Sequence, residues 1–316
     1  MSPPYPAAPP AVDAPRVSPE EATTVLHAVV ARQARDAGLR VLSIKGPFLA
    51  EQGLRAPDRV PVDVDVLVAP ADFDALVARL AAVGWHTEGI STSPRLYPTH
   101  SATLRHALWP VEIDLHRLFP GFLREAEVVF EELWAGRQEH SWCHQQVATP
   151  APEAHLLLAG LHLLRQPGNL AGPGSLGELV ELVEQRTDVA DLRGAAVELA
   201  ARVGALRTAA PLLQALGHKG PVVCEELPEL ALGWDRRSVS SAADGTPWLL
   251  AVAEASGRDR LMLVARAVWP EAAELRRHYP AEQHLPTYRL RLLRFANIAR
   301  RLPVALREYR DVRSSR

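Results

Sequence analysis

The sequence predicts an α/β amino half followed by an all-α carboxyl half. Helix and strand patterns alternate over residues 19–120, and from about residue 122 apolar residues recur at helical spacing. A strand of alternating valine and aspartate near residue 64 lies at the centre of the first half. We therefore expect a disordered proline-rich tail over residues 1–17, an α/β domain over residues 18–147 and a helical domain over residues 148–316.

Local signals place the elements of the amino half. Ser18, a proline and Glu21 form a capping box that begins the first helix, and Gly38 is expected to end it. Further helices are expected at 47–54 and from Pro70 to about Gly84. Strands are expected at 41–44, 62–68, 85–90, 102–108 and 111–116.

The carboxyl half shows helical periodicity throughout, apart from one irregular interval. Helices are expected at 153–164, 176–183, 189–203, 205–216, 248–268 and 286–308. The interval 217–247 is irregular and is interpreted as a loop.

Composition excludes several classes of protein. The chain has 316 residues, 47% of them hydrophobic and 23% charged, which is ordinary for a globular protein. A net charge of −2 gives no electrostatic case for bulk nucleic-acid binding. The two cysteines lack zinc-ligand spacing, and no apolar run is long enough for a membrane span. Because the start also lacks the pattern of a signal peptide, we expect a cytoplasmic protein.

The central strand carries the strongest functional signal. Val62, Val64, Val66 and Val68 share one face, whereas Asp63 and Asp65 project from the other. Two neighbouring carboxylates repel each other unless a cation lies between them, and Mg²⁺ is held by such groups. The alternative is a solvated strand face, which is the commoner origin of two acids at this spacing when nothing else supports a site.

Two further elements point to the same chemistry. The strand at 111–116 has an apolar face and a polar face that carries Glu112, Asp114 and His116. The first strand ends in Lys45 and Gly46, which lead into a helix whose N-terminus is suited to phosphate. His155 and His162, seven residues apart on a helix, lack the partners of a zinc site and are interpreted as core contacts.

The chain resembles an uncharacterised bacterial nucleotidyltransferase family of the DNA polymerase β-like superfamily. The resemblance covers residues 20–300, and the carboxyl half takes part through His155-Leu-Leu-Leu158, Trp269-Pro270 and Leu275–Tyr279. In the amino half it is carried by Leu42-Ser-Ile-Lys-Gly46, Arg59, Val62-Asp-Val-Asp-Val-Leu67, Gly84-Trp85 and Val111-Glu-Ile-Asp-Leu-His116. It implies an α+β fold: a polymerase β-like core, a mixed sheet with flanking helices, followed by an all-α carboxyl domain.

The resemblance also implies roles for single residues. Asp63, Asp65 and Asp114 would hold Mg²⁺ or Mn²⁺, and Asp114 could serve as general base. Lys45, Gly46, Arg59 and His116 would contact the phosphates of an NTP, with ATP the expected donor. One departure is that Pro47 replaces the serine that usually follows the glycine.

The individual residues have simpler interpretations as well. Lys45 could be an exposed lysine at a strand end, Arg59 could merely pair with a nearby aspartate, and His116 could be structural.

Three functions compete at this stage. The favoured one is transfer of an NMP from an NTP to a small-molecule, peptide or protein acceptor. The alternatives are a non-catalytic nucleotide- or peptide-binding module on the same fold, and a phosphotransferase that moves the γ-phosphate. The sequence identifies neither the acceptor nor the oligomeric state.

Overall fold

The computed structural model describes residues 17–59, 63–87, 101–165, 174–240, 257–270 and 284–314, with a few single positions between 249 and 282. The predicted tail, apart from Val17, and the end of the strand expected at 85–90 lie outside the described residues. Among the helices of this part of the chain, none is both long and apolar enough to cross a membrane.

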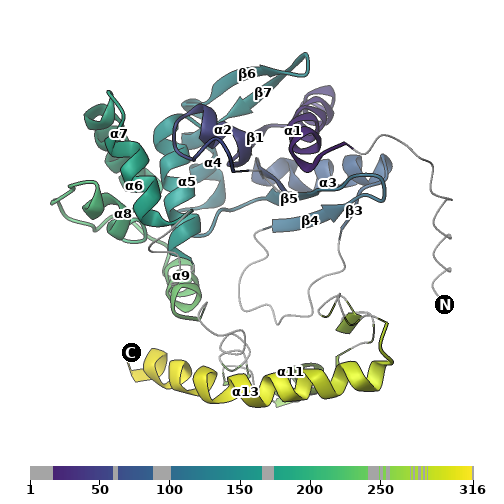
Figure 1. Ribbon diagram of the computed structural model, residues 1–316. Coiled ribbons are helices and arrows are strands. Elements are labelled where there is room, and N and C mark those ends of the chain that lie inside the picture. Colours follow the sequence, from purple (N-terminus) through teal and green to yellow (C-terminus); the bar gives the residue numbers. More distant parts are fainter. Residues whose placement is uncertain are drawn as a thin grey trace.

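The amino half is built on a mixed five-stranded sheet, which confirms the predicted fold class (Figure 1). The strands are β1 (Val41–Ile44), β2 (Asp63–Val68), β3 (His86–Thr87), β4 (Ser101–Arg105) and β5 (Glu112–His116). Their order in the sheet is β1-β2-β5-β4-β3. Strand β2 runs parallel to β5 and antiparallel to β1, and β4 runs antiparallel to both of its neighbours.

The first helix, α1 (Pro19–Asp36), begins and ends through local side-chain and backbone signals. The Ser18 hydroxyl accepts the Glu21 N–H, and the Glu21 carboxylate accepts the Ser18 N–H, so the predicted capping box is present. At the other end, the Leu39 N–H donates to the Ala34 carbonyl and Gly38 has φ +67°. This is a Schellman ending, with Gly38 one position beyond the cap residue Ala37.

The two faces of the sheet pack against different partners. The valines of β2 join one buried cluster with residues of α1 and of α3 (Phe73–Ala82), a helix that follows a single 3₁₀ turn at Pro70–Asp72. Leu42, Ile44 and Leu67 point to the opposite face and belong to a second, larger cluster. The alternation read from the sequence thus places the aspartates of β2 on the face that meets the rest of the chain.

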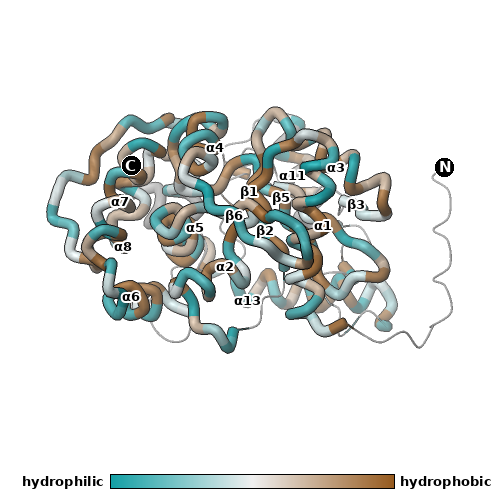
Figure 2. The backbone as a smooth tube through the Cα atoms, turned by 90° about the horizontal axis from the view of Figure 1, so that it is seen from above, coloured by the Kyte–Doolittle hydropathy of each residue, from teal (hydrophilic) through white to brown (hydrophobic). Residues whose placement is uncertain are grey.

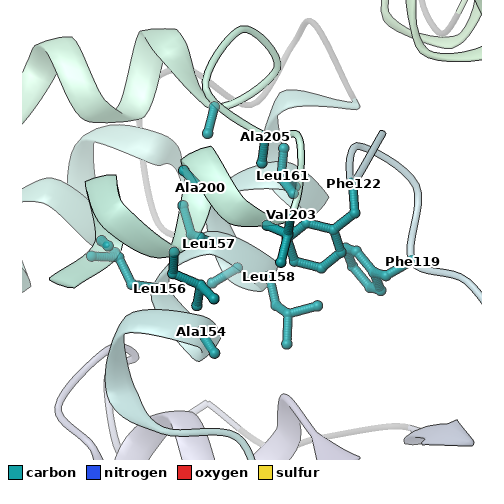
Figure 3. Close-up of a cluster of buried hydrophobic side chains, with 14 of the residues drawn as sticks. Phe119, Phe122, Ala154, Leu156, Leu157, Leu158, Leu161, Ala200, Val203 and Ala205 are labelled. Atoms are coloured by element: carbon teal, nitrogen blue, oxygen red, sulfur yellow. The ribbon is translucent and has the colours of Figure 1, made fainter. Parts of the chain in front are cut away.

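The carboxyl half supplies most of the second cluster. Its helices are α4 (Ala126–Ala135), α5 (Pro152–Leu164), α6 (Leu176–Glu184), α7 (Val189–Arg202), α8 (Ala210–Ala215), α9 (Pro228–Ser240), α11 (Gly257–Val268) and α13 (Thr287–Ser314). Every residue of α5 from Ala154 to Leu161 is buried. Figure 3 shows its leucines packed against Phe119 and Phe122 and against the end of α7. Because α5 lies at the centre of this cluster, the two halves share one hydrophobic core.

Brown apolar and teal polar stretches alternate along the helices in Figure 2, as amphipathic packing requires. The last helix, α13, contacts α9, and α11 and α13 lie below the other elements in Figure 1. The short α2 (Gly46–Glu51) follows β1 and ends three residues earlier than expected.

Two expectations for the region after residue 122 are wrong. Strands β6 (Gln138–Trp142) and β7 (Gln145–Thr149) form a hairpin where only helices were expected. Its two turn residues, Cys143 and His144, have positive φ without being glycine, so the usual turn signal is missing from the sequence. The interval interpreted as a loop contains α9. The sequence of this helix is largely polar and shows no clear apolar face, although Trp234 is buried in the core.

Candidate active site

Strand pairing brings the three predicted acids onto one face of the sheet. In the parallel pair β2–β5, Asp65 lies opposite Asp114 and Asp63 lies opposite Glu112. Residues opposite each other in neighbouring strands share a face and lie close together. The two segments are about fifty residues apart in sequence, and the sheet register alone makes Asp65 and Asp114 neighbours.

Asp65 is the most strongly held of the acids. Only 5% of the residue is exposed, and its Oδ1 atom accepts hydrogen bonds from Lys45 Nζ and from His116 Nε2, each at 2.8 Å. Burial alone would raise the pKa of Asp65, but the hydrogen bond from His116 and the charge of Lys45 outweigh burial and lower the pKa well below its usual range. The carboxylate is therefore ionised at neutral pH.

Asp114 completes a cluster of ligand atoms with Asp65 and His116. One oxygen or nitrogen atom from each of the three residues lies within 4.8 Å of the others. Thr103, on β4, donates its hydroxyl proton to Asp114 Oδ1 at 2.5 Å and so orients that carboxylate. Two carboxylates and an imidazole form a donor set that suits a divalent cation, so the residues present fit the metal implied by the resemblance.

Asp63 lies on the same face but outside this cluster of three. It is partly buried and lines a pocket of about 420 Å³ that Asp65 and Lys45 also line. Burial raises the pKa of Asp63, and the negative charge of Asp65 raises it further, against the opposing effect of Lys45. The two aspartates of the motif thus have different environments: Asp65 accepts hydrogen bonds from Lys45 and His116, whereas Asp63 lines the pocket.

Lys45 occupies a turn that the helical half supports. Its backbone has φ +59° and ψ −143°, a conformation that costs a non-glycine residue on the order of 1–3 kcal/mol. The Lys45 N–H donates to Nε2 of the fully buried His155 at 3.2 Å. Because Nε2 accepts, the proton of His155 resides on Nδ1, which donates to Gln52 Oε1 at 2.7 Å. Burial lowers the pKa of His155 to about 3, so the ring stays neutral.

The pocket lies between the sheet and the helical half, and both contribute to it. Lys45, Gly46 and Arg59 line the pocket, so three of the four residues expected to contact phosphate lie around one space. The fourth, His116, instead donates to Asp65. The rest of the lining comes largely from α5 and α6, including His162 and Glu178, which sequence reasoning did not place at the site.

Comparison with known proteins identifies the family. The model of an uncharacterised nucleotidyltransferase family matches residues 23–218, more than half of the chain. The chain belongs to this family. The match covers every predicted site residue, and it agrees with the resemblance read from the motifs around Asp63 and Asp114. A search of curated proteins finds no match to the chain.

Solved structures show only distant likeness. A nucleotidyltransferase-like antigenic protein from Paracoccidioides brasiliensis is 14% identical, with a TM-score of 0.37, over 62% of this chain and 93% of the other. The antibiotic-resistance factor ANT(2'')-Ia is 13% identical, with a TM-score of 0.33, over 62% of this chain and 90% of the other. A tRNA-processing enzyme is 13% identical, with a TM-score of 0.27, over 90% of this chain and 79% of the other. At these scores the likenesses add nothing to the family assignment.

Proposed function

We propose that the protein transfers a nucleoside monophosphate from an NTP, in a metal-dependent reaction, to a hydroxyl group of a small molecule, peptide or protein. The observation that supports this most strongly is the pairing of β2 with β5. It sets Asp114 beside Asp65, and Asp65 lines a pocket that a lysine and an arginine also line. A pocket of about 420 Å³ is within the usual range of about 300–1,000 Å³ for small-ligand sites.

In this proposal Asp63, Asp65 and Asp114 hold the divalent cations. The metal ions would supply activation of the acceptor hydroxyl and neutralisation of the polyphosphate charge. Asp114, which Thr103 orients, would take the proton of the acceptor hydroxyl as general base. The acceptor oxygen then bonds to the α-phosphorus, the bond from that phosphorus to its bridging oxygen breaks, and pyrophosphate leaves.

Lys45, Gly46 and Arg59 would form the phosphate-binding side of the pocket. The ammonium group of Lys45 and the guanidinium group of Arg59 offset the negative charge of the phosphates. Gly46 has φ +54°, which glycine adopts without steric cost, and a Cβ at this position would lie 3.3 Å from Nε2 of the buried His27. His116 would fix the orientation of Asp65 instead of touching phosphate itself, since its Nε2 already donates to that carboxylate.

The test is thermal unfolding with Mg²⁺ and each NTP in turn, which requires no knowledge of the acceptor. A nucleotide at about 100 times its dissociation constant stabilises the folded state by roughly 2.7 kcal/mol, which is visible as a higher unfolding temperature. Asp63→Asn together with Asp65→Asn should abolish the metal-dependent shift. Glu112→Gln is the matched control, because Glu112 lies on the same face but pairs with Arg105 at 2.5 Å.

Product analysis separates the remaining possibilities. Pyrophosphate release and an NMP adduct support nucleotidyl transfer, whereas release of NDP indicates transfer of the γ-phosphate. Nucleotide binding without turnover on any acceptor would indicate the binding module. In the sequence, Pro47 in place of the usual serine is the feature that favours this alternative. The absence of any shift with any NTP would contradict the proposal.

A further inference from the structure

The end of α5 brings a second group of nitrogen donors to the pocket, outside the residues assigned so far. His162, in the last turn of α5, lines the pocket, and Arg165 caps the same helix. The Arg165 guanidinium lies 5.3 Å from the centre of the Phe119 ring, and Lys45 Nζ lies at the same distance from that ring. The two cations therefore lie over one aromatic side chain, whose ring also contacts that of His116 in the acid cluster.

The contact between Arg165 and His162 fixes the chemical state of the histidine. Arg165 Nη2 lies 2.7 Å from His162 Nδ1. A guanidinium group can only donate, so Nδ1 accepts and the proton of the imidazole resides on Nε2. Burial lowers the pKa of His162 to about 3, with the charges of Lys45 and Arg165 acting in the same direction, and the ring is neutral at physiological pH.

The Nε2–H group of His162 is thus available as a hydrogen-bond donor. In the described part of the chain, no side chain or carbonyl group accepts a hydrogen bond from it, although the residue is largely buried. A neutral donor of this kind, backed by a cation, is suited to an anionic oxygen.

The charge of Arg165 also indicates an anionic ligand. Within the described ranges, no carboxylate forms an ion pair with its guanidinium group; its contacts are His162 and the face of Phe119. Burial lowers the pKa of Arg165, while the nearby charges of Asp65 and Asp114 oppose that effect. A largely buried cation without a carboxylate partner is costly, and an anionic ligand would offset the cost.

We propose that His162, held by Arg165 with its proton on Nε2, binds the polyphosphate chain of the nucleotide. This inference rests on the proposed function for the identity of the ligand. It adds phosphate-binding groups from the helical half to those of Lys45 and Arg59, which line the same pocket. His162 is the residue that touches the ligand, and Arg165 is the residue that positions it.

The experiment is calorimetric titration, in the presence of Mg²⁺, with inorganic tripolyphosphate, with a non-hydrolysable NTP and with an NMP. His162→Phe keeps an aromatic ring but removes the donor, and Arg165→Met removes the positioning charge. Each should weaken binding of tripolyphosphate and of the NTP by about 10-fold to 100-fold, as expected for one charge-assisted hydrogen bond. NMP binding, which involves no β- or γ-phosphate, should change by less than about 2-fold.

Arg137→Met is the matched control. Arg137 also follows a helix end and covers an aromatic ring, that of Trp134 at 4.1 Å, but it lies away from the pocket-lining residues. It should leave all three affinities unchanged. Because the arginine acts through the histidine, the double variant of His162 and Arg165 should bind little more weakly than either single variant.

A second measurement covers the case in which these variants fail to fold. In the wild-type protein, the ¹⁵N signal of His162 Nδ1 should be that of an unprotonated ring nitrogen and that of Nε2 a protonated one. Arg165→Lys, which keeps the charge but loses the planar guanidinium, should weaken tripolyphosphate binding less than Arg165→Met does. A doubly protonated His162 would overturn the inference.

The outcomes separate this inference from the proposed function. Tripolyphosphate and NTP binding within about 2-fold of wild type in His162→Phe would overturn the inference and leave the proposed function standing. Binding of tripolyphosphate that depends on His162, without binding of any nucleotide, would support the anion site and contradict nucleotidyl transfer. If the wild-type protein binds neither ligand, both are refuted.

Discussion

Lowering the pH from 7 to 5 should destabilise the fold strongly, because two buried histidines must stay neutral in it. His27 and His155 are both fully buried, and burial lowers their pKa values to about 4 and about 3 from an ordinary value of 6.5. Below pH 6.5 the unfolded chain binds protons at these rings and the folded chain does not. Stability is therefore fully present above about pH 6.5 and falls as the pH decreases toward 4.

The magnitude follows from the linkage relation. At pH 5 each histidine lies about 1.5 pH units below its unfolded pKa, so each contributes a loss of about 2 kcal/mol, or about 4 kcal/mol together. A domain is typically stable by only about 5–15 kcal/mol. Asp63 acts in the opposite direction, because its pKa is raised in the folded state, so it offsets part of the loss.

The assay is urea unfolding at pH 7, 6 and 5, followed by tryptophan fluorescence. His155→Gln retains a donor and an acceptor for Gln52 and for the Lys45 N–H but does not titrate, so it should remove about 2 kcal/mol of the loss between pH 7 and pH 5. His86→Gln, at an exposed strand position, should leave the dependence unchanged. Equal wild-type stability at pH 7 and pH 5 would refute the reasoning.

Three further predictions concern single substitutions. In the presence of a metal chelator, Asp65→Asn should reduce the free energy of unfolding by about 3 kcal/mol, because the buried ammonium group of Lys45 loses its carboxylate partner. Asp63→Asn should instead be neutral or stabilising, because the folded state raises the pKa of Asp63. Chemical denaturation of both variants checks this, and equal losses would count against the different environments of the two acids. Thr103→Val should weaken metal-dependent NTP binding by about 10-fold, because Asp114 loses the hydroxyl that orients it; calorimetry measures this, and unchanged affinity would contradict the role of Thr103. Gly121→Ala should destabilise the protein by about 2 kcal/mol or more, because the added Cβ would lie 2.7 Å from a core leucine and the backbone has φ +106°. Urea unfolding measures this loss, and wild-type stability would show that the core rearranges to accommodate the methyl group.

Local sequence patterns were sufficient for most elements of the amino half and for the face of the sheet on which the three acids lie. The alternation of Val64 and Val66 with Asp63 and Asp65 gives β2 and its buried face without any tertiary information. The polar face of β5 follows from the same period of two, and it predicted Asp114. The capping box at Ser18 is equally local.

What the sequence did not predict depends on contacts between distant segments. The hydrogen bond from Lys45 to His155 joins residues 110 positions apart, and His155 was interpreted only as a core contact. Thr103 was not singled out, because only the register of β4 against β5 places it opposite Asp114. The sequence around His162 does not show whether this residue lines a pocket or packs in the core, because residues of either kind occur among the apolar positions of α5.

The shared core has a consequence for how the pocket can diversify. One wall, formed by β2, the Lys45 turn and α5, is fixed by strand register and by a helix buried along eight consecutive positions. The other wall comes from Arg55 and Arg59 in a connecting segment and from α6, where Leu179 is buried but Glu178 is only partly so. Substitutions at the first wall disturb folding and chemistry together, whereas those at the second change the shape and charge of the entrance at little cost in stability. Under the proposed function, substitutions at the second wall are therefore expected to change the acceptor without changing the reaction.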